Sequence, residues 1–325
     1  MKNRAAAAAA FLLLAPGPLA EVLSGNVPLF TFLQPVPFLL VTLTYGVPVL
    51  VIREFAATRD LNVIGIVVLG LAYGILNEGV IAKTLTQPDG APLYDFAGYG
   101  RIGALQGGWA MFILVWHALH SVLYPILIAA WLAPGADQPW FAGRMRFVYY
   151  ALVAAVVALC GLYLTNPVRA EPEMFVLYVV TALTLVALAL VFCRRGEGRY
   201  ASVDRRRLRV PLLLGAASLA FYVAQFLSPG HVPFALYAGA SAAVIVFAVV
   251  RMKRAGWRHV PQLLLFGLGD YLAFALFSAV VAVATGRNAL EAILSAGLFV
   301  IILALLARRV MRNPLGRGVD GETLR

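Results

Sequence analysis

The chain has 325 residues, of which 62% are hydrophobic and only 13% are charged. A soluble domain would carry roughly a quarter charged residues, so the composition excludes an ordinary soluble enzyme. The net charge of +11 lies in loops between apolar blocks, where it sets membrane topology and contacts anionic headgroups. We therefore expect membrane lipids as partners and no nucleic acid.

The apolar residues form blocks of about twenty, each long enough to cross ~30 Å of hydrocarbon as a helix. The blocks are continuous and do not alternate with period two, which argues against a transmembrane barrel. The sequence predicts an all-α, polytopic membrane protein with about ten transmembrane helices. The expected spans are roughly 5–23, 36–55, 62–82, 104–132, 146–165, 173–193, 210–228, 233–250, 260–285 and 289–308.

Lysine and arginine are concentrated in every second loop. The loop at 194–209 holds seven arginines against two acids, whereas the loops at 24–35 and 229–232 hold no lysine or arginine. This alternation predicts that both termini are cytoplasmic. The 194–209 loop also divides the chain into an N-terminal half, 1–193, which carries the polar residues, and a C-terminal half, 210–325.

The first block could be read as a secretory signal peptide, because basic residues precede an apolar core that ends in APGPLAE. Cleavage after Ala20 would place Pro18 three residues before the cut, where a small side chain is required. We therefore expect the first helix to be retained. Glu21 follows at its outer end, where it either joins an outer-leaflet cavity or remains at the interface.

The third expected span contains GLAYGILNEG, in which Asn77 and Glu78 interrupt an apolar run. A carboxylate in hydrocarbon costs several kcal/mol unless it is paired, protonated or facing water. We therefore expect Glu78 to be a proton-binding or catalytic carboxylate. Tyr73 shares a face with Asn77 by i,i+4 spacing. The alternative is an interfacial carboxylate paired with Lys83 or Arg101. The Gly- and Pro-rich loop at 83–103 is long enough to cover a site.

The fourth expected span contains WHALHSVLY, which places four polar side chains on one face by i, i+3, i+4 and i+7 spacing: His117, His120, Ser121 and Tyr124. One reading is a proton relay with Glu78, and another is hydrogen bonding to neighbouring helices. Half of a metal site is a weaker reading, because H-x-x-H lacks further ligands. We expect no metal and no cofactor.

Two further polar positions lie in apolar spans. Arg53 and Glu54 end the second span, where an interfacial anchor is expected. Asp270 lies near the middle of the ninth span in FGLGDYLAF, which resembles the G-x-G-D motif of presenilin-type aspartyl proteases. The Tyr-Asp pair of that family has a counterpart in Tyr94 and Asp95, but in a loop, and the family's proline motif near the C-terminus is absent. Asp270 is therefore expected to be a buried polar contact or a coupling residue.

Several segments of the N-terminal half resemble a widespread group of uncharacterised bacterial multi-pass membrane proteins. They cover roughly residues 15–130 and are PLAEVLSGNVPL, YGVPVLVIREFA, LGLAYGILNEG, YGRIG and WHALHSVLYPILI. The resemblance implies a bacterial cytoplasmic (inner) membrane location and supports a site around Asn77 and Glu78. It implies no activity.

A second resemblance is to the CPBP-type intramembrane glutamate proteases. These carry Glu-Glu-x-x-x-Arg, where this chain has Asn77, Glu78 and Lys83, and an aromatic-x-x-x-His element, which Trp116 and His120 match. The first glutamate is missing and the basic residue falls one place late. The resemblance implies that Glu78 activates water and that His120 assists at the oxyanion or in proton transfer.

Three functional hypotheses follow from these residues. The first is a transporter or permease of a small or lipid-like solute, coupled to protons through Glu78 and the histidines. The second is an intramembrane glutamate protease or lipid hydrolase that uses Glu78 and His120, and the third is a non-catalytic structural protein. In the first two, Glu21, Asn77, Tyr73, Arg101, Tyr124 and Asp270 are the candidate substrate-contacting residues. The sequence does not identify the solute or the oligomeric state.

Overall fold

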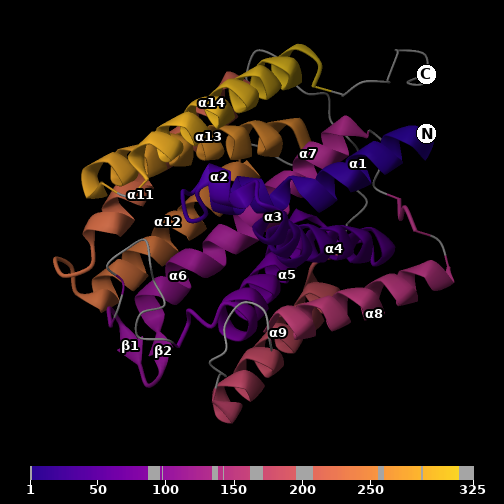
Figure 1. Cartoon of the computed structure of the whole chain (residues 1–325), viewed down its shortest axis with the longest axis horizontal. Coiled ribbons are helices and arrows are strands. Elements are labelled where there is room, and N and C mark those ends of the chain that lie inside the picture. The colour runs from indigo at the N-terminus through magenta and orange to yellow at the C-terminus, as the bar shows by residue number, and fades with distance from the viewer. Residues whose placement is uncertain are drawn as a thin grey trace.

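The computed structural model describes residues 2–86, 96, 98–133, 138–141, 143–161, 171–194, 208–254, 260–286 and 288–314. Nearly all of these residues are helical (Figure 1), which confirms the all-α expectation. The part of the chain described contains one short antiparallel hairpin, formed by β1 (Arg101–Ile102) and β2 (Leu105–Gln106).

The helices follow the apolar blocks closely, and several blocks form a composite of α- and π-helical pieces. In chain order the pieces are α1 (Lys2–Leu14), η1 (Pro18–Val22), α2 (Leu29–Phe32), α3 (Pro35–Val41), η2 (Thr42–Gly46), α4 (Val47–Thr58), α5 (Val63–Leu76), η3 (Asn77–Ile81), α6 (Gly107–Trp116), η4 (His117–Leu123), α7 (Tyr124–Leu132), α8 (Arg144–Leu159), α9 (Pro172–Phe192), α10 (Arg209–Ala216), α11 (Ser218–Leu227), α12 (Phe234–Arg254), α13 (Val260–Thr285) and α14 (Ala289–Arg312). The four η segments are π-helical.

Each of the ten expected spans coincides with one of these helices, but fewer are long and apolar enough to cross a membrane. Within the described residues there are seven such helices: Pro35–Thr58, Val63–Ile81, Gly107–Leu132, Pro172–Phe192, Arg209–Leu227, Val260–Thr285 and Ala289–Arg312. The other three expected spans contain α1, α8 and α12. Pro16 and Pro18 interrupt the first near its middle, and the expected spans that contain α8 and α12 are described only in part.

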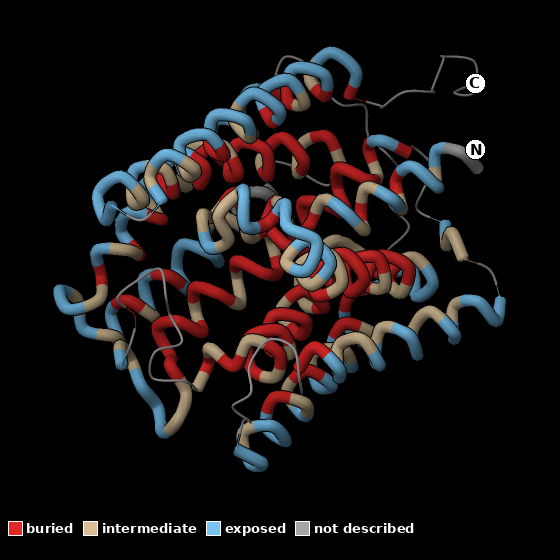
Figure 2. The backbone as a smooth tube through the Cα atoms, viewed as in Figure 1, coloured by how far each residue is buried: buried red, intermediate tan, exposed pale blue. Residues whose placement is uncertain are grey.

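The outer helices expose large apolar side chains. Phe147 on α8, Phe192 on α9 and Leu290 on α14 are 77%, 75% and 70% exposed, and Figure 2 shows long exposed stretches along α8 and α14. Apolar patches of this extent are unusual on a soluble monomer, and they suit a surface that faces lipid. The most buried helices are α5, α13 and the composite formed by α6, η4 and α7.

Proline explains two unusual contacts between helices. The Thr44 carbonyl has no donor four residues on, because Pro48 lacks an N–H, and it accepts the Tyr73 hydroxyl instead, at 2.7 Å. The His120 carbonyl loses its donors in the same way: the Tyr124 N–H bonds to Leu119, and Pro125 has no N–H. The Tyr271 hydroxyl donates to that carbonyl from α13. Breaks in a membrane helix are tolerated where a neighbour satisfies the backbone in this way.

Two glycines let α10 and α13 pack backbone against backbone. A Cβ atom on Gly215 would lie 2.0 Å from the Phe266 carbonyl oxygen, and one on Gly269 would lie 2.1 Å from the Leu212 carbonyl oxygen. Small residues at a helix contact permit this close approach within membranes. The packing places Asp270 of α13 beside Ser218, the first residue of α11.

The start of α1 and the end of α14 lie at the same end of the molecule, and the β1–β2 hairpin lies toward the other end (Figure 1). This arrangement agrees with a chain whose termini share one side of the membrane. The side on which they lie remains the prediction drawn from the charged loops.

Candidate functional site

A cavity of about 200 Å³ lies among the N-terminal helices and α13. Two turn segments contribute to it, through Ser24 and Asn26 after η1 and Thr84 after η3. The cavity therefore lies near the loop end of these helices. Its described lining residues are Ala20, Glu21, Ser24, Asn26, Thr44, Tyr45, Asn77, Glu78, Ile81, Ala82, Thr84, Trp109, Phe112, Ile113, Trp116 and Phe274.

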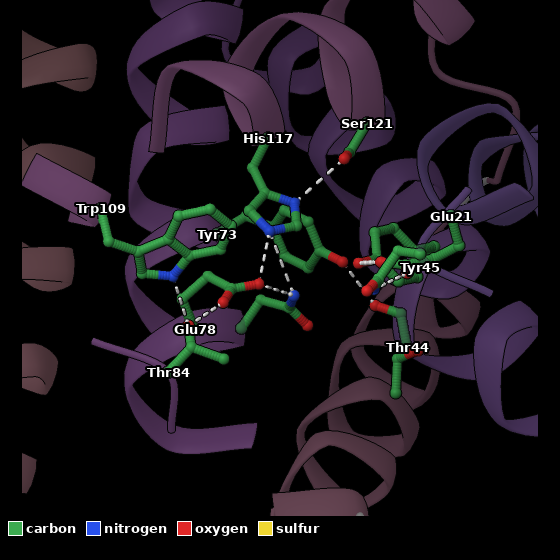
Figure 3. Close-up of polar contacts among 11 residues, drawn as sticks. Glu21, Thr44, Tyr45, Tyr73, Glu78, Thr84, Trp109, His117 and Ser121 are labelled. Carbon is green, nitrogen blue, oxygen red and sulfur yellow. Dashed lines mark hydrogen bonds and ion pairs between the residues drawn. The ribbon is translucent and has the colours of Figure 1, made fainter. Parts of the chain in front are cut away.

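Glu78 lines this cavity and contacts a histidine behind it (Figure 3). His117 Nε2 lies 2.8 Å from Glu78 Oε1, and His117 Nδ1 lies 3.0 Å from Ser121 Oγ. The three residues are at most 5% exposed. Because Ser121 and Glu78 occupy the two ring nitrogens, the imidazole is fixed between them. One buried chain thus runs from the cavity wall into η4.

The other carboxylate oxygen of Glu78 is held by the loop that follows η3. Thr84 donates its hydroxyl to Glu78 Oε2, and the Trp109 indole N–H donates to Thr84 Oγ1 at 2.9 Å. Asn77 Nδ2 lies 3.1 Å from Glu78 Oε1 and 3.3 Å from His117 Nε2. Together these contacts hold the Glu78 carboxylate in one orientation at the cavity wall.

Glu21, in η1, lines the same cavity. Of the two positions considered from the sequence, a cavity and the membrane interface, the structure places it at a cavity. It accepts hydrogen bonds from the Tyr45 hydroxyl of η2 and from the Asn26 amide. Figure 3 shows Glu21 and Tyr45 on one side of His117, and Thr84 and Trp109 on the other. The Tyr73 ring meets the His117 ring edge-on, with centroids 5.5 Å apart. The expected residues Glu21, Tyr73, Asn77, Glu78 and His117 are thus brought together.

His120 points into a second polar cluster. Its Nε2 lies 3.3 Å from Asp270 Oδ2 and 3.2 Å from the Tyr222 hydroxyl. Asp270 also accepts hydroxyl hydrogen bonds from Tyr124 at 2.7 Å, from Tyr222 at 2.6 Å and from Ser218. The sequence placed His117, His120 and Tyr124 on one face. In the structure η4 is π-helical, which spreads each turn over more residues, and the two histidines diverge.

An aromatic pair separates the two clusters. The Trp116 and His120 rings are stacked, with centroids 3.7 Å apart and planes 14° apart, and the Trp116 and Phe274 centroids are 4.1 Å apart. Trp116 and Phe274 line the cavity, whereas His120 and Asp270 do not. The expected pairing of His120 with Glu78 is therefore not formed, and His117 takes that place.

Arg101 lies apart from both clusters. It is exposed in β1 and donates from Nε to the Gly103 carbonyl at 3.0 Å. Lys83 is buried but does not line the cavity. Residues 87–95 and 97 of the 83–103 loop lie outside the described residues, and these include Asp89, Tyr94 and Asp95.

Arg53 and Glu54 are buried and do not form the interfacial anchor that the sequence suggested. Arg53 Nη1 lies 3.0 Å from Glu54 Oε2, and its guanidinium carbon lies 3.5 Å from the centre of the Trp140 ring. The carboxylate also accepts the backbone N–H groups of Trp140 and Phe141, at 2.9 and 3.0 Å. The pair thus connects α4 to the 138–141 segment, whose backbone N–H groups donate to the Glu54 carboxylate.

Sequence reasoning missed five of the partners: Tyr45, Thr84, Trp109, Ser218 and Tyr222. Each is a residue type that membrane helices and their loops use freely, so its position carries no local signal. Within the described residues, no group of three or more His, Cys, Asp and Glu side chains has a geometry suited to a metal ion. The cavity chemistry therefore rests on carboxylates, one imidazole, hydroxyls and aromatic faces.

Ser121 does not present a nucleophile to the cavity. It is fully buried and bonds to Nδ1 of His117, on the side of the ring opposite Glu78. The Ser121–His117–Glu78 chain is suited to holding or passing a proton at Glu78.

Comparison with known proteins gives one match. The model of a family described as "Uncharacterized membrane protein family" matches residues 13–316. The match extends through the C-terminal half, well beyond residues 15–130, to which the bacterial resemblance was assigned. No curated protein and no solved structure matches the chain.

Proposed function

The chain belongs to an uncharacterized family of membrane proteins, and we propose that it is a proton-coupled transporter of a small solute. The protein is a multi-pass membrane protein, and the seven long apolar helices found among its described residues accord with this, as do its exposed apolar flanks. Our proposal places it in a bacterial cytoplasmic membrane with both termini inside, where the basic loops favour that orientation. The solute would enter the cavity that Glu21 and Glu78 line.

The observation that carries this proposal is the contact between Glu78 and His117 at the wall of the cavity. An ionisable group within a membrane span is costly, and it is retained mainly where it binds protons or solute. Glu78 faces the cavity, while His117 lies behind it at 2.8 Å. A proton taken up from the cavity can therefore be shared between carboxylate and imidazole, and solute bound beside it would change that proton's affinity.

Helix geometry adds support. The π-helical segments η1 to η4 each contribute a residue to this region: Glu21 lies in η1, Tyr45 in η2, Glu78 in η3 and His117 in η4. Single π-helical turns within longer helices occur frequently at functional sites. Interrupted helices that meet around a polar site are also a feature of many transporter folds.

Hydrolysis is the second candidate, and one observation favours it. Glu78 and His117 are within hydrogen-bond distance at a cavity, which is an arrangement that can activate water. The CPBP-type assignment used His120 as the partner, and that side chain is held by Asp270. Hydrolysis predicts cleavage of a lipid or peptide by purified protein, whereas transport predicts flux with no new product.

The proposal is tested with purified protein in liposomes that contain a pH-sensitive dye. We expect small solutes, screened as a panel, to include at least one that drives a pH change in wild-type vesicles. Glu78→Gln should reduce that change to the level of empty liposomes, because an amide cannot exchange the proton. Glu173→Gln, at an exposed position on the first turn of α9, should behave as wild type.

Size-exclusion profile and thermal unfolding of Glu78→Gln should match wild type, which ensures that lost flux is not lost folding. Solute flux that ignores pH and persists in Glu78→Gln would contradict proton coupling through this residue. Product formation without any flux would instead establish the hydrolytic alternative.

A further inference from the structure

The cavity lining combines acidic and aromatic side chains. Glu21 and Glu78 provide the carboxylates, and Asn26, Tyr45 and Thr84 surround them with hydroxyl and amide groups. The other lining residues include four aromatic side chains: Trp109, Phe112, Trp116 and Phe274. Consecutive members of this group are in ring contact, with Trp109 and Phe112 centroids 5.7 Å apart and Phe112 and Trp116 centroids 6.4 Å apart.

The charge of the cavity lining is negative. None of its described lining residues is a lysine or an arginine. Among the ion pairs of the described residues, His117 is the one basic side chain that contacts a cavity carboxylate, and its partner is Glu78. Two carboxylates against one imidazole leave at least one negative charge to be neutralised when both are ionised. In a membrane interior that charge requires a proton or a cation.

The carboxylates retain hydrogen-bond capacity toward the cavity. A carboxylate has about four acceptor positions, and Glu21 accepts from Tyr45 and Asn26. Glu78 contacts Asn77, His117 and Thr84. Each group can therefore accept one further donor, or face a cation that donates nothing, without losing the partners that position it.

Size and the aromatic wall select among cations. The cavity volume of about 200 Å³ corresponds to about seven waters at ~30 Å³ each, which accommodates a ligand of comparable heavy-atom count. A bare metal ion would leave the aromatic faces unused. Aromatic rings attract alkylammonium groups through their negative faces while covering the attached carbons.

We propose that the solute is a small organic cation, an alkylamine or quaternary ammonium compound, that exchanges for a proton at Glu78 and Glu21. The inference rests on the proposed transport function and names its substrate class. The exchange is balanced in charge, because one cation replaces one proton on the carboxylates. The aromatic wall would cover the alkyl groups while the acidic wall faces the nitrogen.

Proton and cation would compete, so binding should weaken as pH falls. Within the part of the chain that the structure describes, the titratable groups facing Glu78 and Glu21 are His117 from η4, Tyr45 from η2 and Tyr73 from α5. Protonation of either carboxylate removes the charge that attracts the cation, and protonation of His117 adds a repelling charge. Both changes act in the same direction.

Binding is measured by calorimetry and by tryptophan fluorescence on the purified full chain, with choline and tetramethylammonium as probes. The uncharged isostere of choline, in which carbon replaces the quaternary nitrogen, is the matched control ligand. We expect both cations to bind, the isostere not to bind, and the apparent Kd for choline to rise as pH falls. Glu78→Gln should abolish binding, whereas Glu173→Gln should not change it.

The aromatic wall is tested separately. Phe112→Leu removes a ring from the cavity and should weaken choline binding severalfold, whereas Phe192→Leu, at a position 75% exposed on α9, should have no effect. Equal binding of choline and its isostere, or choline binding that strengthens as pH falls, would overturn the inference. So would binding of sodium in preference to either organic cation.

A flux assay separates this inference from the transport function. Proton flux driven by a neutral or anionic solute, together with absent choline binding, would overturn the organic-cation inference and leave proton-coupled transport standing. Choline binding with the predicted pH dependence, but no flux of any solute, would support the binding site and overturn transport.

Discussion

Glu54 shows what a single buried carboxylate does in this protein. It is fully buried, contacts the Arg53 guanidinium at 3.0 Å and accepts backbone N–H groups from Trp140 and Phe141. Arg53 in turn donates to the Gln138 carbonyl at 2.9 Å. The pair is satisfied on both sides, so its desolvation is offset by hydrogen bonds, as a buried ion pair requires.

Replacing one member of this pair should be costly. We expect Glu54→Gln to lower the free energy of unfolding by about 3 kcal/mol, because the buried Arg53 guanidinium loses its charged contact with Glu54. Thermal unfolding in detergent, followed by circular dichroism, measures the effect. The exposed Glu173→Gln variant is the control, and equal unfolding temperatures for the two variants would refute this role of Glu54.

At the scale of elements, the π-helical segments determine where side chains point. Pro125 follows η4 and leaves the His120 carbonyl without a backbone donor, and Tyr271 of α13 supplies one. Pro48 follows η2, and Tyr73 satisfies the Thr44 carbonyl in the same way. Both η2 and η4 are therefore tied to a neighbouring helix by a tyrosine hydroxyl that satisfies a carbonyl left open by proline.

This dependence can be measured with a double-mutant cycle. Tyr271→Phe should destabilise the wild-type protein by about 1 kcal/mol, within the range for hydrogen bonds between membrane helices. In a Pro125→Ala background the cost should be smaller, because the restored N–H can reach the His120 carbonyl. Unfolding temperatures of the four proteins give the coupling. Strictly additive effects would show that proline and tyrosine act independently.

At the scale of the whole molecule, Asp270 joins the two halves of the chain. Its carboxylate accepts from Tyr124 in the N-terminal half and from Ser218 and Tyr222 in the C-terminal half, beside His120. Phe274, one turn further along α13, lines the cavity with Trp116. The C-terminal half therefore contributes both a wall of the cavity and the support behind that wall.

Removal of this junction should affect stability more than the cavity itself. We expect Asp270→Leu to destabilise the protein by about 3 kcal/mol, because buried hydroxyls of Tyr124 and Tyr222 lose their acceptor. Asp270→Asn, which retains an acceptor oxygen, should lose less. Thermal unfolding ranks the three proteins. An Asp270→Leu variant as stable as wild type would show that the halves are held by apolar packing alone.

Local sequence was sufficient for part of the site. An acidic residue within an apolar run is a property of a few adjacent positions, so Glu78, Asn77 and Glu21 were predicted as site residues without any knowledge of packing. The helical class, and the positions of the longer helices, follow from apolar block lengths for the same reason. The number of membrane spans stays a prediction, because part of the fifth expected span, 146–165, lies outside the described residues.

Tertiary structure decided which histidine serves which carboxylate. A regular 3.6-residue repeat places His117 and His120 on one face, but the π-helical turn between them directs one to Glu78 and the other to Asp270. The carboxylate partners lie 39 and 150 positions away from their histidines in the chain. The pairing is set by helix packing and by a local change in hydrogen-bond register, and neither is encoded in the spacing of the histidines.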